Sequence, residues 1–172
     1  MSEPQITTVI PLHNHEKWIM QAVYSITNSS YRKNRIIIID DGSSDFSYQV
    51  VVDSLKNCQK IVFPKNDEPK TIYKGNINNI EVLAISFNKS YGPSFTRNYG
   101  IKTAWDGTDL FALLDSDDYY EPTKIEESVK IWLKAPSVIG IVYSDFSTFG
   151  EDGIFHRQFK EPFSYKRLQQ EC

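Results

Sequence analysis

The stretch RIIIIDDGSSD, residues 35–45, places four isoleucines directly before two aspartates, a glycine, two serines and a third aspartate. A short β-branched run bounded by polar residues is typical of a strand buried on both faces, as in a parallel sheet covered by helices. In such sheets ligands bind at the carboxyl ends of the strands. These acids could therefore face a ligand, or they could form only a turn and helix cap, with Ser43, Ser44 or Asp45 as the capping residue.

The same pattern returns in DLFALLDSDDYYEP, residues 109–122, where an apolar run again ends in a cluster of acids. The carboxyl ends of parallel strands meet at one edge of a sheet, so acids at two strand ends would share a rim. We therefore expect Asp41 and Asp115 at the same edge. The repetition favours a ligand site over two unrelated turns.

Apolar periodicity divides most of the chain into alternating strands and helices. Strands are predicted at residues 5–10, 35–40, 59–63, 80–86, 109–114 and 138–143. Helices are predicted within 16–29, 45–57, 94–105 and 121–134, the third of them starting at Pro93 or Ser94. Residues 64–79, rich in Pro, Lys and Asn, are predicted to be a surface excursion, and residues 145–157 a hairpin that turns at GEDG. The alternation predicts an α/β sandwich with a mainly parallel central sheet.

Composition limits the kinds of protein that this chain can be. A length of 172 residues with 40% hydrophobic content suits one well-packed domain over residues 1–172. A net charge of −3 disfavours a general nucleic-acid binder. No apolar run approaches the roughly 20 residues that span a bilayer, and the start resembles no signal peptide. Cys58 and Cys172 lack metal-site spacing and are expected to be reduced thiols of a cytoplasmic protein.

Asp115 and Asp117 lie two residues apart just after a predicted strand, so in extended geometry their side chains point the same way. Close carboxylates repel each other unless a proton or a cation neutralises them. Mg²⁺ or Mn²⁺, bound by one or two carboxylates and by substrate phosphates, fits this pattern. An acidic turn that caps the helix within 121–134 fits it equally well on spacing alone.

The other candidates carry weaker signals. Arg97 could face a phosphate from its helix or pair with a surface acid, and His13, alone after a strand, is more often structural than catalytic. The segment GPSFTRNYG lacks the spacing of a Walker phosphate loop. His15 and His156 show no zinc-site spacing, and the chain has no Gly-x-Ser-x-Gly elbow for acyl transfer.

Taken together, four segments resemble the inverting glycosyltransferases of family 2, which have the GT-A fold. The matching segments are TVIPLHN (8–14), IIIIDDGSSD (36–45), NKSYGPSFTRNYGI (88–101) and ALLDSDDYYEP (112–122). They occur in the family's order and at about its spacing, over roughly residues 6 to 150. The resemblance implies a GT-A-like, Rossmann-related α/β/α sandwich with a nucleotide-sugar site at the rim described above.

The resemblance also implies roles for single residues. Pro11 and His13 match positions beside the base and ribose, although the family usually has tyrosine where His13 stands. Asp41 matches the aspartate that hydrogen-bonds the base, and Lys89 lies in the loop that closes over the base. Arg97 matches the arginine of an Ala-Arg-Asn segment. The family's Asp-x-Asp motif corresponds to Asp115, Ser116 and Asp117, with the metal assigned to the two acids.

The resemblance implies transfer of a sugar from a nucleoside diphosphate, with UDP as the expected nucleotide, to a glycan, lipid or protein hydroxyl. The reaction would invert the anomeric carbon and need Mn²⁺ or Mg²⁺. The family's catalytic base lies in a later segment, so no residue of this chain is assigned that role. We expect a donor-binding half, with residues 145–172 as the start of an incomplete acceptor region.

Two other functions stay open beside this one. A nucleotide-sugar-binding module without transfer activity would use the same residues. A nucleotidyltransferase is disfavoured, because PLHNHEKW stands where its glycine-rich basic loop is expected. The sequence leaves the donor sugar, the acceptor and homo-oligomer formation undetermined.

Overall fold

The computed structural model describes residues 3–61, 71–149 and 155–159. The chain divides into two compact units, Met1–Lys130 and Ile131–Cys172. The single domain expected over residues 1–172 stays a prediction. Among the described residues, no helix is both long and apolar enough to cross a membrane.

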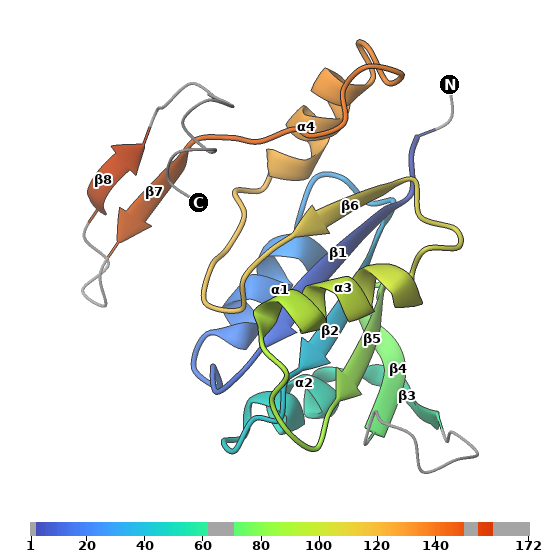
Figure 1. Ribbon diagram of the computed structural model, residues 1–172, viewed down its shortest axis with the longest axis vertical. Coiled ribbons are helices and arrows are strands. Elements are labelled where there is room, and N and C mark those ends of the chain that lie inside the picture. Colours follow the sequence, from blue (N-terminus) through green and yellow to red (C-terminus); the bar gives the residue numbers. More distant parts are fainter. Residues whose placement is uncertain (1–2, 62–70, 150–154, 160–172) are drawn as a thin grey trace. The chain divides into compact units, whose positions relative to one another are not determined.

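The described part of the first unit carries the strands of one sheet together with helices (Figure 1). The strands are β1 (Ile6–Leu12), β2 (Asn34–Asp40), β3 (Lys56–Ile61), β4 (Thr71–Ile77), β5 (Ile80–Ser86) and β6 (Leu110–Leu113). The helices are α1 (Ile19–Thr27), α2 (Ser47–Ser54), α3 (Pro93–Thr103) and α4 (Lys124–Trp132), which ends in the second unit. The positions of all four predicted helices are confirmed, and α3 starts at Pro93.

The sheet has the order β3-β4-β5-β2-β1-β6. Strands β5, β2, β1 and β6 are parallel, whereas β4, next to the edge strand β3, pairs antiparallel with both β3 and β5. Leu12 pairs with Asp40, and Asp40 pairs with Ser86, so the carboxyl ends of three parallel strands are level. The α/β fold and its mainly parallel centre are confirmed, and the parallel strands end at one rim as predicted.

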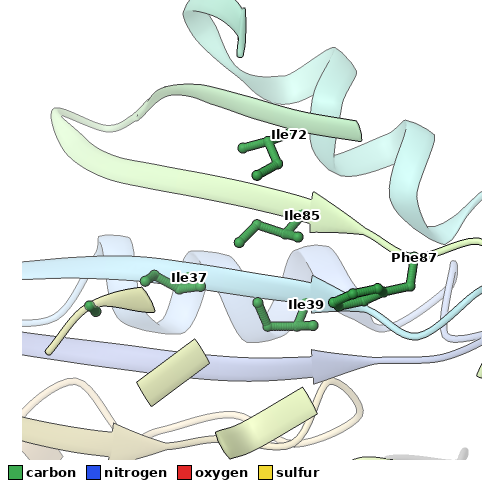
Figure 2. Close-up of a cluster of buried hydrophobic side chains, with 6 residues drawn as sticks. Ile37, Ile39, Ile72, Ile85 and Phe87 are labelled. Atoms are coloured by element: carbon green, nitrogen blue, oxygen red, sulfur yellow. The ribbon is translucent and has the colours of Figure 1, made fainter. Parts of the chain in front are cut away.

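The isoleucine run fills both faces of the sheet, and all four side chains are buried. Because alternate residues of a strand point to opposite faces, Ile37 and Ile39 share one face while Ile36 and Ile38 share the other. Ile37 and Ile39 pack with buried residues of β4, β5 and the segment after β5 (Figure 2). This burial on both faces explains why the run is continuous and does not alternate with polar residues.

Helix α3 lies against β1 and β2, in front of the sheet in Figure 1. Its Gly100 is buried, and a Cβ at that position would lie 2.6 Å from Val9 Cγ1. The close approach requires glycine there. It brings the helix near enough to the sheet for Arg97, one turn earlier, to reach the strand ends.

The segment predicted as a surface excursion, residues 64–79, contains a strand, and this prediction was wrong for β4. Its composition suggested a loop, but Ile72, Gly75 and Ile77 are buried along the strand, Ile72 on one face and the other two on the opposite face. Asn78 and Asn79 both have positive φ, 49° and 65°, and form a two-residue hairpin turn into β5. The third strand, predicted at 59–63, runs from Lys56 to Ile61, and residues 62–70 lie outside the described residues.

In the second unit, the strand predicted at residues 138–143 does not form. Its apolar run favoured a buried strand, but Val138 and Ile141 are 83% and 84% exposed, and no described strand pairs with the segment. The predicted hairpin is present as β7 (Phe146–Phe149) paired antiparallel with β8 (Phe155–Phe159). Its predicted turn at residues 150–153 lies outside the described residues.

Candidate functional site

A cavity of about 420 Å³ lies at the carboxyl ends of β1, β2 and β6. Its walls come from the end of β1 and the following loop, the start of the loop after β2, the first turns of α3, and the turn after β6. The lining residues are Pro11, Leu12, His13, His15, Asp41, Ser90, Gly92, Pro93, Thr96, Arg97, Asp115, Ser116 and Asp117. Every site residue predicted from the sequence is among them except Lys89.

Hydrogen bonds hold the loop after β1 against the loop after β2. Asn14, which has a left-handed φ of 55°, donates its backbone N–H to Ser43 Oγ at 3.0 Å. Its side-chain oxygen accepts the Ser44 backbone N–H at 2.8 Å. The backbone N–H of His15 donates to Ser47 Oγ at 2.8 Å. The serines after β2 therefore fix where the histidines of the β1 loop lie.

Asp45 takes part in the same hydrogen-bonded contact between the two loops. It accepts the backbone N–H of Glu16 at 3.1 Å and that of Ser47 at 3.0 Å. Partial burial opposes ionisation, but hydrogen bonds from Ser47 and from the Glu16 backbone outweigh it and hold the pKa of Asp45 below its usual value. The turn role predicted for Asp45 is confirmed, but the expectation that Ser43, Ser44 or Asp45 caps α2 was wrong, because Phe46 is at the N-cap position and makes no side-chain capping hydrogen bond.

Asp41 lies buried behind the loop that leads into α3. Its carboxylate accepts hydrogen bonds from Ser90 Oγ at 2.6 Å and from the backbone N–H groups of Tyr91 and Gly92 at 2.7 and 2.9 Å. Its backbone carbonyl lies 2.9 Å from Nδ1 of His13, which must therefore be the protonated nitrogen of that ring. Asp41 holds the walls of the cavity together.

The residue after Asp41 is glycine because the α3 loop approaches it closely. Gly42 has a φ of +67°, and a Cβ there would lie 2.7 Å from the carbonyl carbon of Lys89. The Lys89 ammonium lies 4.9 Å from the centre of the Tyr91 ring, which is a cation–π distance. Lys89 thus lies in the loop before α3, as predicted. Its ammonium group lies over the Tyr91 ring, and the residue does not line the cavity.

The acids after β6 are less enclosed. Arg97 forms an ion pair with Asp115, and the two side chains are 31% and 47% exposed. The side chain of Asp117 is 53% exposed. Partial burial, and then repulsion from Asp117 and Asp115, raises the pKa of the neighbouring Asp118. This cluster therefore keeps negative charge accessible from the cavity.

Ser116 is buried between these acids, and its Oγ lies 2.7 Å from Nδ1 of His15. The same nitrogen is 4.0 Å from Asp117 Oδ1. No role was predicted for His15 from the sequence, because no metal-site spacing involves it. Its place two residues after His13 in one strand-end loop was the only signal that could have found it.

The acids of the cavity fit a cation that is also bound by substrate phosphates better than a cation bound by protein side chains alone. Among the described residues, no group of three or more His, Cys, Asp or Glu side chains is arranged to hold a metal ion. Asp115 and Asp117 both supply carboxylate oxygens to the cavity, and Mg²⁺ and Mn²⁺ prefer such oxygens together with substrate phosphates. The residues present fit a divalent cation whose remaining ligands come from a diphosphate.

Comparison with known proteins points in the same direction as this geometry. Residues 7–172 match the model of a family described as glycosyl transferase family 2. An uncharacterized glycosyltransferase of Haemophilus influenzae is 28% identical over 137 residues, which cover 78% of this chain and 44% of that protein. The UDP-N-acetylglucosamine--dolichyl-phosphate N-acetylglucosaminyltransferase of Methanococcus voltae is 29% identical, over 76% of this chain and 48% of that protein. The chain spans less than half the length of these curated relatives.

Two solved structures share the fold. The structure of S. aureus TarS 1-349 in complex with UDP-GlcNAc has a TM-score of 0.58 and 19% identity, covering 76% of this chain and 31% of that one. The mannosyltransferase PcManGT from Pyrobaculum calidifontis, in complex with GDP-Man and Mn²⁺, has a TM-score of 0.60 and 17% identity. The match covers 80% of this chain and 34% of that one. These similarities establish a GT-A type of α/β fold.

Proposed function

The chain belongs to glycosyl transferase family 2, and on that premise we propose that its cavity binds a nucleoside-diphosphate sugar for transfer to a hydroxyl acceptor. The transfer inverts the anomeric carbon and depends on a divalent cation. The proposal rests on one observation: a buried acid, an arginine and two accessible acids from three parts of the sequence line one cavity. These residues are Asp41, Arg97, Asp115 and Asp117.

The base is proposed to lie beside Asp41. A carboxylate has about four acceptor sites, and the α3 loop occupies three of those of Asp41. One site is left for an N–H of the base. Uracil is the base we favour, because the M. voltae relative and the TarS complex are both named with UDP-GlcNAc.

The diphosphate is proposed to lie between Arg97 and the turn after β6. Arg97 supplies a fixed positive charge, and its ion pair with Asp115 holds both side chains at the cavity wall. A divalent cation, when bound, neutralises charge on the departing nucleoside diphosphate. Asp115 and Asp117 would hold it, while Arg97 orients the phosphates.

A module that binds the donor without transferring sugar is the second candidate. It would use the same cavity residues, Asp41, Arg97, Asp115 and Asp117. No described residue is assigned as the base that would deprotonate the acceptor.

Calorimetric titration with UDP and GDP, each with Mn²⁺ and with chelator, tests the donor site. We expect micromolar-range binding of one nucleotide with Mn²⁺ and much weaker binding with chelator. Equal affinity in both conditions would exclude the metal role, and no binding of either nucleotide would refute the function. Release of free nucleoside diphosphate from UDP-GlcNAc, with and without candidate acceptors, separates transfer from binding.

A further inference from the structure

The ring of His15 is held on one side and open on the other. Its backbone N–H is bonded to Ser47 Oγ at 2.8 Å, and its Nδ1 lies 2.7 Å from Ser116 Oγ. The residue lines the cavity with 35% of its side chain exposed. Among the described residues, nothing is bonded to Nε2. A ring fixed in this way presents one nitrogen to a ligand.

The surroundings of Ser116 decide which nitrogen carries the proton of the neutral ring. Ser116 is buried. Among the described residues, its hydroxyl has one hydrogen-bond partner, the Nδ1 of His15. A buried hydroxyl proton without an acceptor is costly, whereas an unused hydroxyl lone pair is not. The Ser116 O–H therefore donates to Nδ1, and the ring proton lies on Nε2. The nitrogen that is not bonded to Ser116 is therefore a donor.

We propose that His15 is a phosphate-binding residue, and that its Nε2–H donates a hydrogen bond to an oxygen of the nucleoside diphosphate. The ring lies beside Asp117, with its Nδ1 4.0 Å from the carboxylate. An N–H donor there suits a phosphate oxygen that the cation proposed at Asp117 would bring to the turn after β6. Arg97 reaches the same turn through Asp115. The inference rests on the proposed function and adds to it a second phosphate contact, from the loop after β1.

Two substitutions separate a contact made by Nε2 from a structural role of Nδ1. In His15→Asn the amide can replace Nδ1 and keep Ser116 bonded, but it places no donor where Nε2 was. In His15→Gln the longer amide places an N–H₂ near the position of Nε2. Direct phosphate contact predicts that His15→Asn binds UDP or GDP about ten-fold more weakly and that His15→Gln retains most of the affinity.

The phosphate itself is tested with uridine or guanosine, which have the base and ribose alone. We expect the His15→Asn protein to bind the nucleoside as the unsubstituted protein does, because the lost contact is with phosphate. The chain has three histidines, so ¹⁵N-histidine spectra can be assigned by substituting each in turn. Adding the diphosphate should move the Nε2 signal of His15.

The outcomes are distinct from those that test the function. If the unsubstituted protein binds the diphosphate and His15→Asn binds it equally well, the donor site stands and the His15 contact is wrong. If His15→Asn and His15→Gln lose diphosphate and nucleoside affinity alike, His15 only positions Ser116, and the contact is again wrong. If the unsubstituted protein binds no diphosphate, both the function and the contact are refuted.

Discussion

The two acid clusters at the strand ends look alike in the sequence and differ in the folded protein. After β2, the carboxylate of Asp41 is buried and accepts three hydrogen bonds from the protein itself. After β6, the side chain of Asp117 is about half exposed, and Asp115 has one ion pair with Arg97. The carboxylate after β2 is held mainly by the protein itself, whereas the acids after β6 leave most of their charge open to a ligand. The number of protein donors around each carboxylate tells the two roles apart.

The sharpest way to break this comparison is to remove one acid from each cluster and measure stability. Asp41→Ala leaves three donors of the α3 loop without their acceptor, so we expect it to lower the free energy of unfolding by about 3 kcal/mol. Asp117→Ala removes an exposed side chain, and we expect a change within about 0.5 kcal/mol. Urea unfolding followed by tryptophan fluorescence measures both. Equal losses would show that the clusters have the same structural role.

Nucleotide binding tests whether the acids after β6 act on a ligand. Asp117→Asn removes a charged ligand, so nucleotide affinity with Mn²⁺ should fall by about 1.5–2 kcal/mol, or roughly ten- to thirty-fold. Affinity with chelator should stay as it was. Asp118→Asn is the matched control, since Asp118 does not line the cavity. Calorimetric titrations of both variants measure these affinities. An equal loss of nucleotide affinity in Asp118→Asn would show that Asp117 has no special role in metal binding.

Arg97→Gln asks whether the pair with Asp115 serves binding or only stability. The pair is partly exposed, so the variant should lose at most about 1 kcal/mol of stability. Nucleoside diphosphate affinity should fall by about 1 kcal/mol or more, because a charged phosphate contact is lost. Thermal unfolding and titration on the same samples compare the two quantities. Lost stability with unchanged affinity would make the pair a structural one.

The smallest expected effect is a pH dependence at Asp45. Its pKa is lowered in the folded protein, so its ionised form adds stability above the unfolded pKa of about 3.9. That stability is lost as the pH falls through this value toward the folded pKa. Solvent screening keeps the difference from Asp45→Asn near 0.5 kcal/mol at neutral pH. Unfolding free energies at pH 6 and pH 3 should show the gap closing, and a gap that widens in acid would contradict the assignment.

The sequence predicted the fold and the rim where local pattern and tertiary structure agree. The isoleucine run, the four helices and the shared edge of Asp41 and Asp115 follow from periodicity and from the geometry of parallel sheets. Strand β4 was missed because its surroundings are rich in Pro, Lys and Asn, and because its buried residues Ile72, Gly75 and Ile77 show no regular alternation. The run at 138–143 failed for the opposite reason, since apolar composition alone cannot supply a pairing strand.

The roles of single acids could not be predicted because their partners are distant in the sequence. The donors to the Asp41 carboxylate lie 49 to 51 residues away, and Ser116 is 101 residues from His15. A spacing pattern places such residues at one rim, as it did here. It cannot say which carboxylate the protein's own loops will enclose.

The tight turn at Asn78 and Asn79 has a consequence for how the sheet assembles. It joins β4 to β5 with two residues, and this pairing can form in about 1–10 μs because little chain must be ordered first. The contact of β1 with β6 pairs Ile6 with Leu110 and must close a loop of about one hundred residues. The antiparallel edge can therefore form early and offer β5 as a template for the central strands. Pulsed hydrogen exchange during refolding should find the amides of β4 and β5 protected before those of β6.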